Sequence, residues 1–572
     1  MNQPNRLAQG GRIDRRQPLS FRFNGQTYQG YAGDTLASAL LANGVDLVNR
    51  SFKYSRPRGI VAAGEEEPNA VVQLGSTPAT QVPNVRATQQ ALYDGLEARS
   101  TNGWPDAQRD VMRWVGKLGG PFMPPGFYYK TFMAPASMWM TYEKAIRKTA
   151  GLGSSPTAAD PDRYDHMNQH CDVLVVGAGP AGLSAALAAA HAGARVILCD
   201  EQEEMGGSLL DSRAQLDDRP AAQWARETLA TLAEMDNVTL LPRTTANGYH
   251  DHHFVTLHER RTEHLGETAV SADGHRPVRS RMHRVRAGQV VLATGAHERP
   301  LVYAHNDVPG NLLAGAVSTY IRRYGVVPGN RLVLSTSNDH AYRAALDWQE
   351  AGREVAAIVD ARDAPEGDVV ERARAAGIRI ITGSAVIEAK GSQRVSAARV
   401  ARIDREAFTV VGQVETLACD TIASSGGYSP VIHLASHTGA RPVWDESILG
   451  FVPTTVAGVH AAGGARGVYP LNAVLADGLD TGMRAATALG FTAATSTAAS
   501  PHCEAPDEGP ACALFQVPHE KSTLRAPKQF VDLQNDVTAG AIEVATREGF
   551  ESIEHVKRYT AMGFGTDQGK LG

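Results

Sequence analysis

A glycine-rich turn followed by an acidic residue is the feature of this sequence that points most directly to chemistry. Gly177, Gly179 and Gly182 have the GxGxxG spacing. In such a turn the first glycine makes a tight bend, the second lets a pyrophosphate approach the backbone, and the third lets a helix pack on a strand. Asp200 follows 23 residues after Gly177 and is placed to accept a hydrogen bond from an adenosine ribose hydroxyl. The pattern predicts a dinucleotide held at a helix N-terminus.

The elements that must position this turn are also visible in the sequence. The apolar run 172–176 predicts a buried strand, the alanine-rich run 183–192 a helix, and residues 195–199 a second strand. Together they make one complete βαβ unit. The alternative interpretation is a relic βαβ unit that binds nothing.

Two later strands end in small residues. Residues 290–293 lead into Thr294 and Gly295, and residues 458–462 lead into a glycine pair that ends with Gly464. With the first turn, this three-part pattern resembles the two-dinucleotide-binding-domain flavoprotein superfamily, which has a glutathione-reductase-like fold. In that superfamily the strand before Thr294 would back the first nucleotide, and the last strand brings an acid to the ribitol of FAD. Because Gly464 stands at that acid position, we expect NAD, which has no ribitol, rather than FAD.

A second βαβ layout covers residues 331–360, but its turn has lost the glycines. Ser335, Ser337 and His340 stand at the three glycine positions. Close approach of a phosphate needs a glycine backbone. The sequence therefore predicts an inserted second Rossmann-like domain without a dinucleotide, and a single bound dinucleotide in the chain. Residues 296–300, which follow Gly295, are interpreted as a structural turn beside the nucleotide.

The N-terminal region has the signals of a small mixed domain. Alternating Leu19, Phe21 and Phe23 precede Asn24-Gly25, a strong β-hairpin signal. Asp34 is expected to cap a short helix that Gly44 ends. A hairpin followed by a helix predicts a β-grasp, ferredoxin-like domain.

Residues 103–144 concentrate tryptophan, phenylalanine, tyrosine and methionine. We interpret them as a buried strap packed on neighbouring domains. The alternative is a subunit interface, because aromatic residues and methionine are enriched in interface cores. Residues 151–165 and 493–510 are rich in small and polar residues and are interpreted as linkers.

Composition excludes several classes of function. The 56 basic and 61 acidic residues give a formal charge of −5, which argues against nucleic acid and anionic membrane as partners. The N-terminus has no apolar signal region, and the sequence has no uninterrupted run of 18 apolar residues of the kind that crosses a membrane. The five cysteines form no CxxC pair, so we expect reduced thiols and a cytoplasmic protein. No metal site is predicted, since His250, His252 and His253 form an isolated cluster, and catalytic residues stay unknown.

Several further motifs are specific enough to indicate a family. They resemble the α subunit of heterotetrameric sarcosine oxidase over the chain from about residue 10. The matching segments are residues 51–60, 64–70, 177–182, 200–202, 206–208, 530–538, 552–559 and 565–570.

This resemblance implies that the chain binds NAD, that a partner β subunit binds FAD, and that FMN lies at the contact between the two subunits. Further small subunits in the complex are implied as well. It also implies a substrate, sarcosine or a similar secondary amine, demethylated to glycine with formation of hydrogen peroxide. Nucleotide contacts are implied at Ala181, Asp200, Glu201, Gln202, Gly207, Ser208, Ala246, Gly464, Tyr469 and Leu471. Two alternatives stay open: a self-sufficient FAD-dependent NAD(P)H oxidoreductase, and a non-catalytic scaffold with structural NAD.

Relatives of this family carry an iron–sulfur cluster in the β-grasp domain or near the tail. No cysteine precedes Cys171 and none lies in residues 530–535, so we expect no iron–sulfur cluster. The family's α subunit continues into a folate-binding domain that this chain does not contain. The chain is therefore interpreted as a fragment, a split subunit or a variant without folate coupling.

The predicted fold class is α/β, a glutathione-reductase-like pair of Rossmann domains with an N-terminal β-grasp domain and a small helical C-terminal segment. The predicted parts are a β-grasp domain without cluster at 10–100, the strap and linker at 101–165, the first part of the NAD-binding domain at 166–300, the inserted domain at 301–425, the second part of the NAD-binding domain at 426–492, and the helical segment at 510–572.

Overall fold

The computed structural model describes residues 3–111, 113–114, 125–126, 134–270, 274–492, 500–504 and 506–572. The chain forms two compact units, each built from segments that are distant in sequence. The first unit combines Met1–Asp160, Glu298–Gly427 and Glu508–Gly572, and the second combines Pro161–His297 and Tyr428–Asp507. The aromatic residues 122, 127–129 and 132 of the predicted strap lie outside the described residues, as do residues 493–499 of the second predicted linker.

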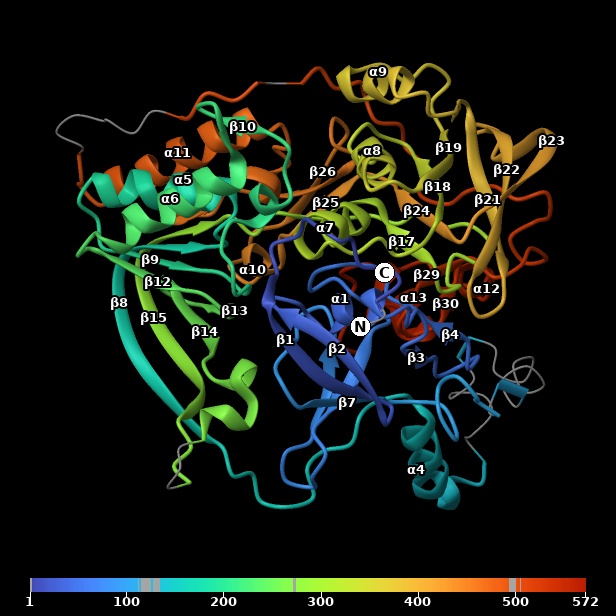
Figure 1. The fold of residues 1–572 in the computed structure, drawn as a ribbon, viewed down its shortest axis with the longest axis horizontal. Helices are drawn as coiled ribbons and strands as arrows, with labels where there is room; N and C mark the ends of the chain where they lie inside the picture. The colour runs from blue at the N-terminus through green and yellow to red at the C-terminus, as the bar shows by residue number, and fades with distance from the viewer. Residues whose placement is uncertain are drawn as a thin grey trace. The chain divides into compact units, whose positions relative to one another are not determined.

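The second unit is a seven-stranded sheet in the order β12-β9-β8-β15-β14-β13, with β28 also paired to β15. Helices α5, α6 and α11 cover one face of it (Figure 1). Its strands are β8 (Arg163–Val176), β9 (Val196–Cys199), β12 (Val238–Leu241), β13 (Thr244–His250), β14 (Phe254–Arg260), β15 (Val278–Leu292) and β28 (Val459–Ala461). Its main helices are α5 (Pro180–His191), α6 (Ala221–Ala233) and α11 (Leu471–Thr487).

Shorter elements complete the second unit. They are β10 (Gln215–Leu216), β11 (Arg219–Pro220), β25 (Tyr428–Pro430), β26 (Pro442–Asp445), β27 (Gly450–Pro453), α10 (His433–Ser436), and the 3-10 helices η3 (Gly207–Leu210), η4 (Glu263–Ala269) and η5 (Gly463–Arg466). Strand β16 (Ala296–Glu298) ends where the chain enters the first unit.

Strand β8 begins nine residues before the predicted strand start at Asp172, inside the predicted linker. Its polar first half pairs in parallel with β15. An Arg281–Asp165 ion pair at 2.8 Å and a contact of 3.0 Å between Gln169 and His283 join the two strands there. Cross-strand polar pairs stabilise a sheet without an apolar pattern, which is why hydrophobic periodicity did not reveal this half.

The N-terminal sheet of the first unit has the order β2-β1-β7-β5-β6. Its elements are β1 (Asp14–Phe23), β2 (Gln26–Ala32), α1 (Leu36–Ala42), β5 (Val71–Leu74), β6 (Val82–Arg86) and β7 (Leu96–Ser100), with the small ribbon β3 (Asn49–Arg50) and β4 (Pro57–Arg58). The predicted hairpin is confirmed, and Asn24 and Gly25 both have the positive φ of its tight turn.

The predicted helix cap was wrong by one residue. Thr35, not Asp34, is the N-cap of α1, and it forms a capping box with Ser38. Asp34 instead accepts hydrogen bonds from the Ser38 hydroxyl and the Tyr31 backbone N–H, and pairs with Arg6 at 2.6 Å. The Arg6 guanidinium thus makes a charge-assisted hydrogen bond to this carboxylate.

The inserted part of the first unit contains a five-stranded parallel sheet in the order β17-β24-β18-β19-β20 and a three-stranded antiparallel sheet. The parallel strands are β17 (Asn311–Leu313), β18 (Arg331–Thr336), β19 (Glu354–Asp360), β20 (Ile380–Ile381) and β24 (Thr421–Ser425). The antiparallel strands are β21 (Ser384–Gly391), β22 (Val395–Asp404) and β23 (Thr409–Ala418), and the helices are α7 (Ala314–Tyr324), α8 (Tyr342–Glu350) and α9 (Asp368–Ala375).

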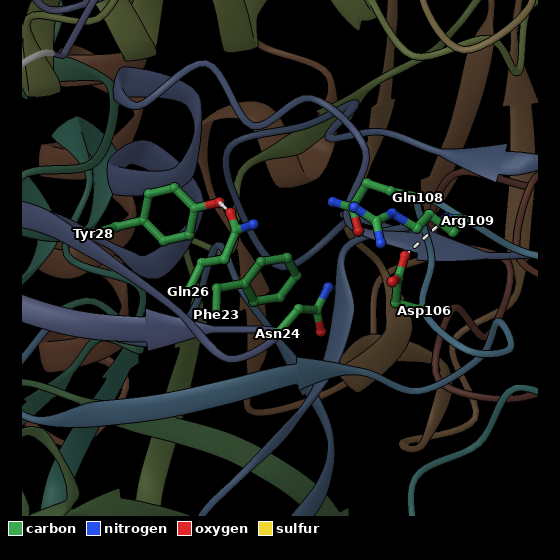
Figure 2. Close-up of a pocket in the computed structure, with 7 residues that line it drawn as sticks. All are labelled: Phe23, Asn24, Gln26, Tyr28, Asp106, Gln108 and Arg109. Atoms are coloured by element: carbon green, nitrogen blue, oxygen red, sulfur yellow. Dashed lines mark hydrogen bonds between the residues drawn. The ribbon is translucent and has the colours of Figure 1, made fainter.

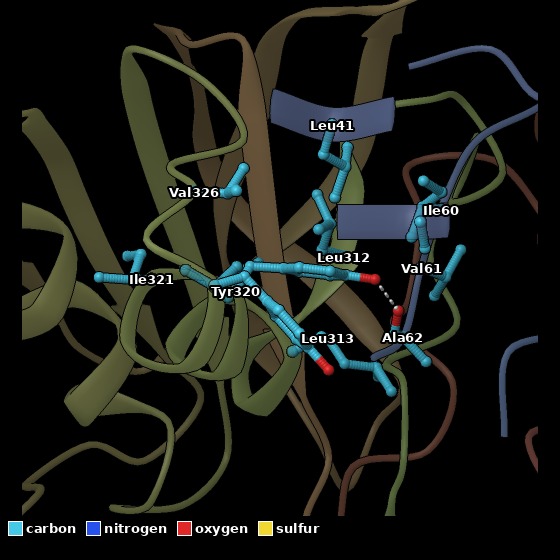
Figure 3. Close-up of a cluster of buried hydrophobic side chains, with 14 of the residues drawn as sticks. Leu41, Ile60, Val61, Ala62, Leu312, Leu313, Tyr320, Ile321 and Val326 are labelled. Atoms are coloured by element: carbon cyan, nitrogen blue, oxygen red, sulfur yellow. Dashed lines mark hydrogen bonds between the residues drawn. The ribbon is translucent and has the colours of Figure 1, made fainter. Parts of the chain in front are cut away.

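One apolar core joins the β-grasp part to the inserted part. Leu41, Ile60 and Val61 lie in the same buried cluster as Leu312 and Tyr320 (Figure 3). Figure 3 also shows the Tyr320 hydroxyl donating to the Ala62 carbonyl at 2.8 Å. The two parts are therefore held together by side-chain burial.

The C-terminal segment contains β29 (Phe530–Asp532), β30 (Val537–Thr538), α12 (Ala539–Arg547) and α13 (Ile553–Thr560), and the first unit also contains η2 (Ala136–Met138) and α4 (Trp139–Thr149). A buried ion pair fixes this tail on the β-grasp part: Arg56 Nε lies 2.5 Å from Asp536 Oδ1. Burial acts to raise the pKa of Asp536, but Arg56 and Arg58 outweigh it and hold that pKa below the ordinary value.

A buried carboxyl gives the first unit a pH-dependent stability. Glu298 accepts a hydrogen bond from the backbone N–H of Gly315 in the first turn of α7, and burial raises the pKa of Glu298 to about 7. The folded state thus holds a proton that the unfolded state has released above its pKa of 4.5. The contribution of Glu298 to stability is complete below pH 4.5 and is lost as the pH rises through 7.

We predict that Glu298→Gln removes this loss. Between pH 4 and pH 8, the unfolding free energy of the variant should rise by about 3 kcal/mol relative to that of the unsubstituted protein, because each pKa unit corresponds to about 1.4 kcal/mol. Urea unfolding across this pH range measures the difference. Glu234→Gln, at an exposed position, is the control, and parallel pH curves for all three proteins would contradict the prediction.

Candidate functional site

The glycine turn after β8 is built so tightly that two of its glycines admit no side chain. Gly177 has φ +98°, and an added Cβ would lie 2.3 Å from the Ala293 carbonyl oxygen. A Cβ on Gly182 would lie 1.7 Å from the Gly177 carbonyl oxygen. These contacts agree with the predicted roles of the first and third glycines, a sharp turn and close packing of helix on strand.

Gly179 differs from its two neighbours because space lies in front of it. An added Cβ would meet no atom nearer than the Gly207 Cα, at 3.9 Å. Gly179 is also the N-cap of α5, has no side chain to cap the helix, and is followed by Pro180 at the first helical position. The helix N-terminus therefore presents backbone N–H groups and a positive dipole end to a cradle that a pyrophosphate fits.

Asp200, which follows β9, is bound to the turn itself. Its carboxylate accepts from the backbone N–H of Ala178 at 2.7 Å and from that of Gln202 at 2.8 Å. Sequence reasoning assigned Asp200 only to a ribose hydroxyl. A carboxylate has about four lone-pair sites, so it can hold the turn and still accept from a ligand hydroxyl.

Residues 200–202 are held by hydrogen bonds from β13, from the residue before it and from a side chain of β14. Thr244 N–H donates to the Asp200 carbonyl at 2.7 Å, which brings β13 and its residue Ala246 beside β9. The Glu201 carbonyl accepts from Arg260 at 2.6 Å, and the Gln202 carbonyl accepts from the Arg243 N–H. Ser208 is exposed next to Gly207. The predicted residues 200–202, 207 and 208 thus surround one turn.

The glycine pair after β28 also reaches this turn. A Cβ on Gly463 would lie 2.7 Å from the Ala181 Cβ, and a Cβ on Gly464 would lie 3.1 Å from the Gly295 carbonyl carbon. The Thr294 hydroxyl donates to the Val431 carbonyl at 2.7 Å, so Thr294 fixes a loop. The structure therefore places Gly463 beside Ala181 and Gly464 beside Gly295, and their contact with a nucleotide stays a prediction.

Asp477 is a residue of this site that sequence reasoning missed. From α11 its carboxylate accepts from the Gly463 N–H at 2.7 Å and pairs with Arg466 at 2.8 Å. Leu471 begins α11, and the rings of Tyr469 and Tyr428 are 5.6 Å apart beside it. Only the folded helix brings Asp477 back to the glycine pair, and an acidic residue within a helix gives no such signal in the sequence.

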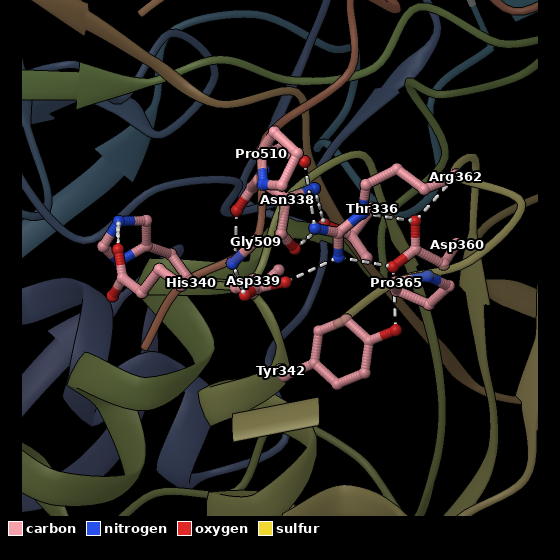
Figure 4. A network of polar contacts seen from close by, with 12 residues as sticks. Thr336, Asn338, Asp339, His340, Tyr342, Asp360, Arg362, Pro365, Gly509 and Pro510 are labelled. Carbon is pink, nitrogen blue, oxygen red and sulfur yellow. Dashed lines mark hydrogen bonds and ion pairs between the residues drawn. The ribbon is translucent and has the colours of Figure 1, made fainter. Parts of the chain in front are cut away.

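In the inserted parallel sheet, the edge that corresponds to the nucleotide turn is occupied by side chains and backbone of the protein itself (Figure 4). Asp360, at the end of β19, accepts from the Arg362 guanidinium at 2.7 Å and from the Tyr342 hydroxyl at 2.7 Å. Asp339, in the turn after β18, pairs with Arg362 and accepts from the Gly509 N–H, both at 2.7 Å. Ser335 and Ser337 are fully buried. The absence of a dinucleotide from the inserted Rossmann-like domain stays a prediction.

A hollow beside the N-terminal hairpin is the other concave feature of note (Figure 2). Its lining residues are Phe23, Asn24, Gln26, Tyr28, Asp106, Gln108 and Arg109. Tyr28 donates to Gln26 at 2.7 Å, and the Arg109 N–H donates to Asp106 at 2.8 Å. The hollow contains none of the predicted site residues.

No helix within the described ranges has the length and apolar character needed to cross a bilayer.

Three protein families match separate parts of the chain. Residues 171–489 match the pyridine nucleotide-disulphide oxidoreductase family, residues 16–103 a 2Fe-2S iron-sulfur cluster binding domain, and residues 526–572 the sarcosine oxidase A3 domain. The first match covers the nucleotide turn and the inserted part together.

Individual relatives agree with these matches. Sarcosine oxidase subunit alpha of Rhizobium meliloti (strain 1021) is 46% identical over 99% of this chain and 55% of its own length. The subunit alpha of Corynebacterium sp. (strain U-96) is 36% identical over 100% of this chain and 54% of its own length. The chain thus spans about half the length of these relatives. The predicted resemblance to the sarcosine oxidase α subunit is confirmed.

A solved structure, L-proline dehydrogenase from P.horikoshii, has a TM-score of 0.64 at 17% identity and covers 100% of this chain and 92% of that chain. At this identity the likeness shows the fold alone. With the family matches, it confirms the predicted α/β class with an N-terminal ferredoxin-like domain and a pyridine nucleotide oxidoreductase part.

The N-terminal match contradicts our prediction of no iron–sulfur cluster, because residues 16–103 belong to a cluster-binding domain family. That prediction considered only cysteines, whereas the match rests on the whole domain. Residues 16–103 contain no cysteine, so their side chains do not supply the thiolates that hold such a cluster.

The geometry of the turn predicts opposite effects for two glycine substitutions. Gly179→Val should lose its bound dinucleotide, but its stability should stay close to that of the unsubstituted protein when both are compared without nucleotide, because the atom nearest to the added Cβ, the Gly207 Cα, is 3.9 Å away. Gly182→Ala should lower the unfolding free energy by about 1–3 kcal/mol, because its methyl group overlaps the Gly177 carbonyl. Thermal unfolding and nucleotide extraction measure both effects, and equal stability losses in the two variants would contradict this assignment.

Proposed function

Because the chain belongs to the pyridine nucleotide-disulphide oxidoreductase family, we propose that its second unit binds NAD and that it serves as the NAD-binding subunit of a flavin-dependent oxidase of sarcosine or a similar secondary amine. The complex would demethylate its substrate oxidatively to glycine, with hydrogen peroxide as a further product. The substrate in this proposal comes from the names of the similar proteins, which are alpha subunits of sarcosine oxidase.

The observation that carries the NAD proposal is the cradle at Gly179. It is open, it lies at a helix N-terminus, and Asp200 stands beside it. A dinucleotide pyrophosphate would bind the N–H groups of α5, and Asp200, Glu201 and Gln202 would surround the adenosine ribose. When bound, NAD would supply a nicotinamide ring able to accept or donate hydride.

The glycine pair distinguishes NAD from FAD in this proposal. Gly464 offers no carboxylate for a ribitol, and the Asp477 carboxylate already accepts from the Gly463 N–H and pairs with Arg466. Backbone around Gly464 is also close, with a Cβ position only 3.1 Å from Gly295. Both facts favour a ligand that makes no charged contact there.

We place the flavin on a partner subunit and the contact surface around the aromatic segment. The interpretation of this segment as a buried strap is wrong for its described tryptophans: Trp104 is 66% exposed, Trp114 52% and Trp139 42%. Met138 and Met140 are exposed beside Trp139. Exposed tryptophan and methionine are typical of interface cores. We expect this assembly in the cytoplasm, because all five cysteines are free.

The cofactor proposal predicts that the isolated chain releases NAD on acid denaturation. Asp200→Ala should weaken NAD binding by about 1.5–3 kcal/mol, the scale of a charge-assisted hydrogen bond. Chromatography of the extract and NAD titration measure both, with the exposed Glu234→Ala as control. Stoichiometric FAD in the extract would favour the self-sufficient flavoprotein instead. Unchanged NAD affinity in the Asp200 variant would contradict the site.

The partner proposal predicts that the chain alone consumes no oxygen with sarcosine and that the purified native complex does. Trp139→Ala should weaken assembly by about 2 kcal/mol or more if this tryptophan is a central interface contact, while NAD content stays unchanged. Trp444→Ala, an exposed tryptophan of the second unit, is the matched control. Oxygen uptake by the chain alone would overturn the subunit assignment, and normal assembly of the Trp139 variant would overturn the proposed surface.

A further inference from the structure

Four backbone N–H groups of the β-grasp part converge on one buried carboxylate. Glu67 Oε2 accepts from Val61 at 2.8 Å and Ala62 at 2.7 Å. Its Oε1 accepts from Asn69 at 2.7 Å and Ala70 at 2.9 Å. Glu67 is fully buried. Consecutive N–H groups pointing into one concavity form an anion-binding nest of the kind that holds phosphates and iron–sulfur clusters.

The positions in this nest have a recognisable spacing. Ala62 and Glu67 are separated by four residues, and Glu67 and Ala70 by two. The ligands of a plant-type [2Fe–2S] cluster follow the same spacing, C-x4-C-x2-C, with a fourth cysteine further along the chain. The carboxylate therefore comes from the central position, and two of the four N–H groups that bind it belong to the flanking positions.

A fourth side chain reaches the same loop from outside it. The Thr88 hydroxyl donates to the Gly64 carbonyl at 2.6 Å, and the neighbouring Ala87 N–H donates to the Ala70 carbonyl at 2.8 Å. Thr88 is only 4% exposed. It thus stands beside the loop where a fourth ligand would complete the set.

The loop is held rigidly by the inserted part of the same unit. The Leu313 N–H donates to the Val61 carbonyl at 2.8 Å, and the Tyr320 hydroxyl donates to the Ala62 carbonyl at 2.8 Å (Figure 3). Ile60, Val61 and Ala62 are buried in the shared core. The direction of the N–H groups is therefore fixed by packing outside the loop.

We infer that residues 61–70 retain the backbone cradle of a [2Fe–2S] site, with Ala62, Glu67, Ala70 and Thr88 at the four ligand positions and the Glu67 carboxylate bound by the N–H groups of that cradle. The inference concerns the first unit, and none of its tests depends on NAD or on amine oxidation. It gives the family match of residues 16–103 a physical basis in backbone geometry.

The direct test is to supply thiolates at the four positions of the full-length chain. The variant Ala62→Cys, Glu67→Cys, Ala70→Cys, Thr88→Cys, purified with iron and sulfide present, should gain about two iron and two sulfide per chain over the unsubstituted protein. It should also gain visible absorption and, after reduction, a paramagnetic signal.

The matched control carries the same number of cysteines with one misplaced, Gln89→Cys in place of Thr88→Cys. It should gain little iron and no such spectrum. Equal gains in the two variants, or no gain in a first variant whose circular dichroism and thermal unfolding match those of the unsubstituted protein, would overturn the assignment of ligand positions.

A second variant keeps the inference testable if the cysteine variant does not fold. Glu67→Gln places an amide group, with N–H donors of its own, against the N–H groups of the nest. The backbone amides of Ala62 and Ala70 should then exchange hydrogen at least about tenfold faster, while Glu66→Gln should leave them unchanged. Unchanged exchange in the Glu67 variant would show that the carboxylate does not hold the cradle, and would overturn that part of the inference.

Discussion

Backbone N–H groups in loops must find acceptors when they are buried, and in this chain carboxylates satisfy many of them. Asp200 accepts from the nucleotide turn, Asp477 from the glycine pair, Glu67 from the loop after β4, Glu298 from α7 and Asp536 from residues 53 and 54. A loop whose N–H groups are bound in this way has one defined conformation. The shape of each candidate site depends on that constraint.

The two Rossmann-like sheets share a βαβ layout but differ in the contacts of the acidic residue at the second strand. Asp200 directly follows the second strand of one βαβ unit, and Asp360 is the last residue of the second strand of the other. Asp200 accepts from main-chain N–H groups and faces an open turn, whereas Asp360 is paired with Arg362 and Tyr342. The Asp360 carboxylate is thus buried and paired with protein groups. The first sheet is therefore suited to a ligand, and the second to holding the first unit together.

The N-terminal domain illustrates the limit of reasoning from ligand residues. The absence of cysteines led us to predict no iron–sulfur cluster in this ferredoxin-like domain, but its sequence over residues 16–103 matches a cluster-binding family. The strands, helix and loop that define the domain are fixed by packing against Leu312, Leu313 and Tyr320. Backbone geometry of this kind can persist while the ligand side chains change. The fold of the domain and its cysteine content therefore have to be judged separately.

The sequence alone determined the elements whose causes are local. Strand periodicity and the conformational freedom of glycine were enough to predict the hairpin at Asn24-Gly25 and the tight turn at 177–182, and to notice that Ser335 and Ser337 replace glycines in the second turn. The family resemblance that the sequence motifs indicated is confirmed. The assignment of NAD and of its contact residues stays a prediction.

Tertiary structure decided what depends on residues distant in the chain. Asp477 reaches Gly463 because α11 folds back onto the sheet, and Glu67 is buried because the inserted part covers its loop. The polar half of β8 is a strand because β15 pairs with it, and Trp104 and Trp139 stay exposed although composition favoured their burial. Each of these outcomes is set by which surfaces the fold brings into contact, and hydrophobic pattern and motif spacing do not encode that partner choice.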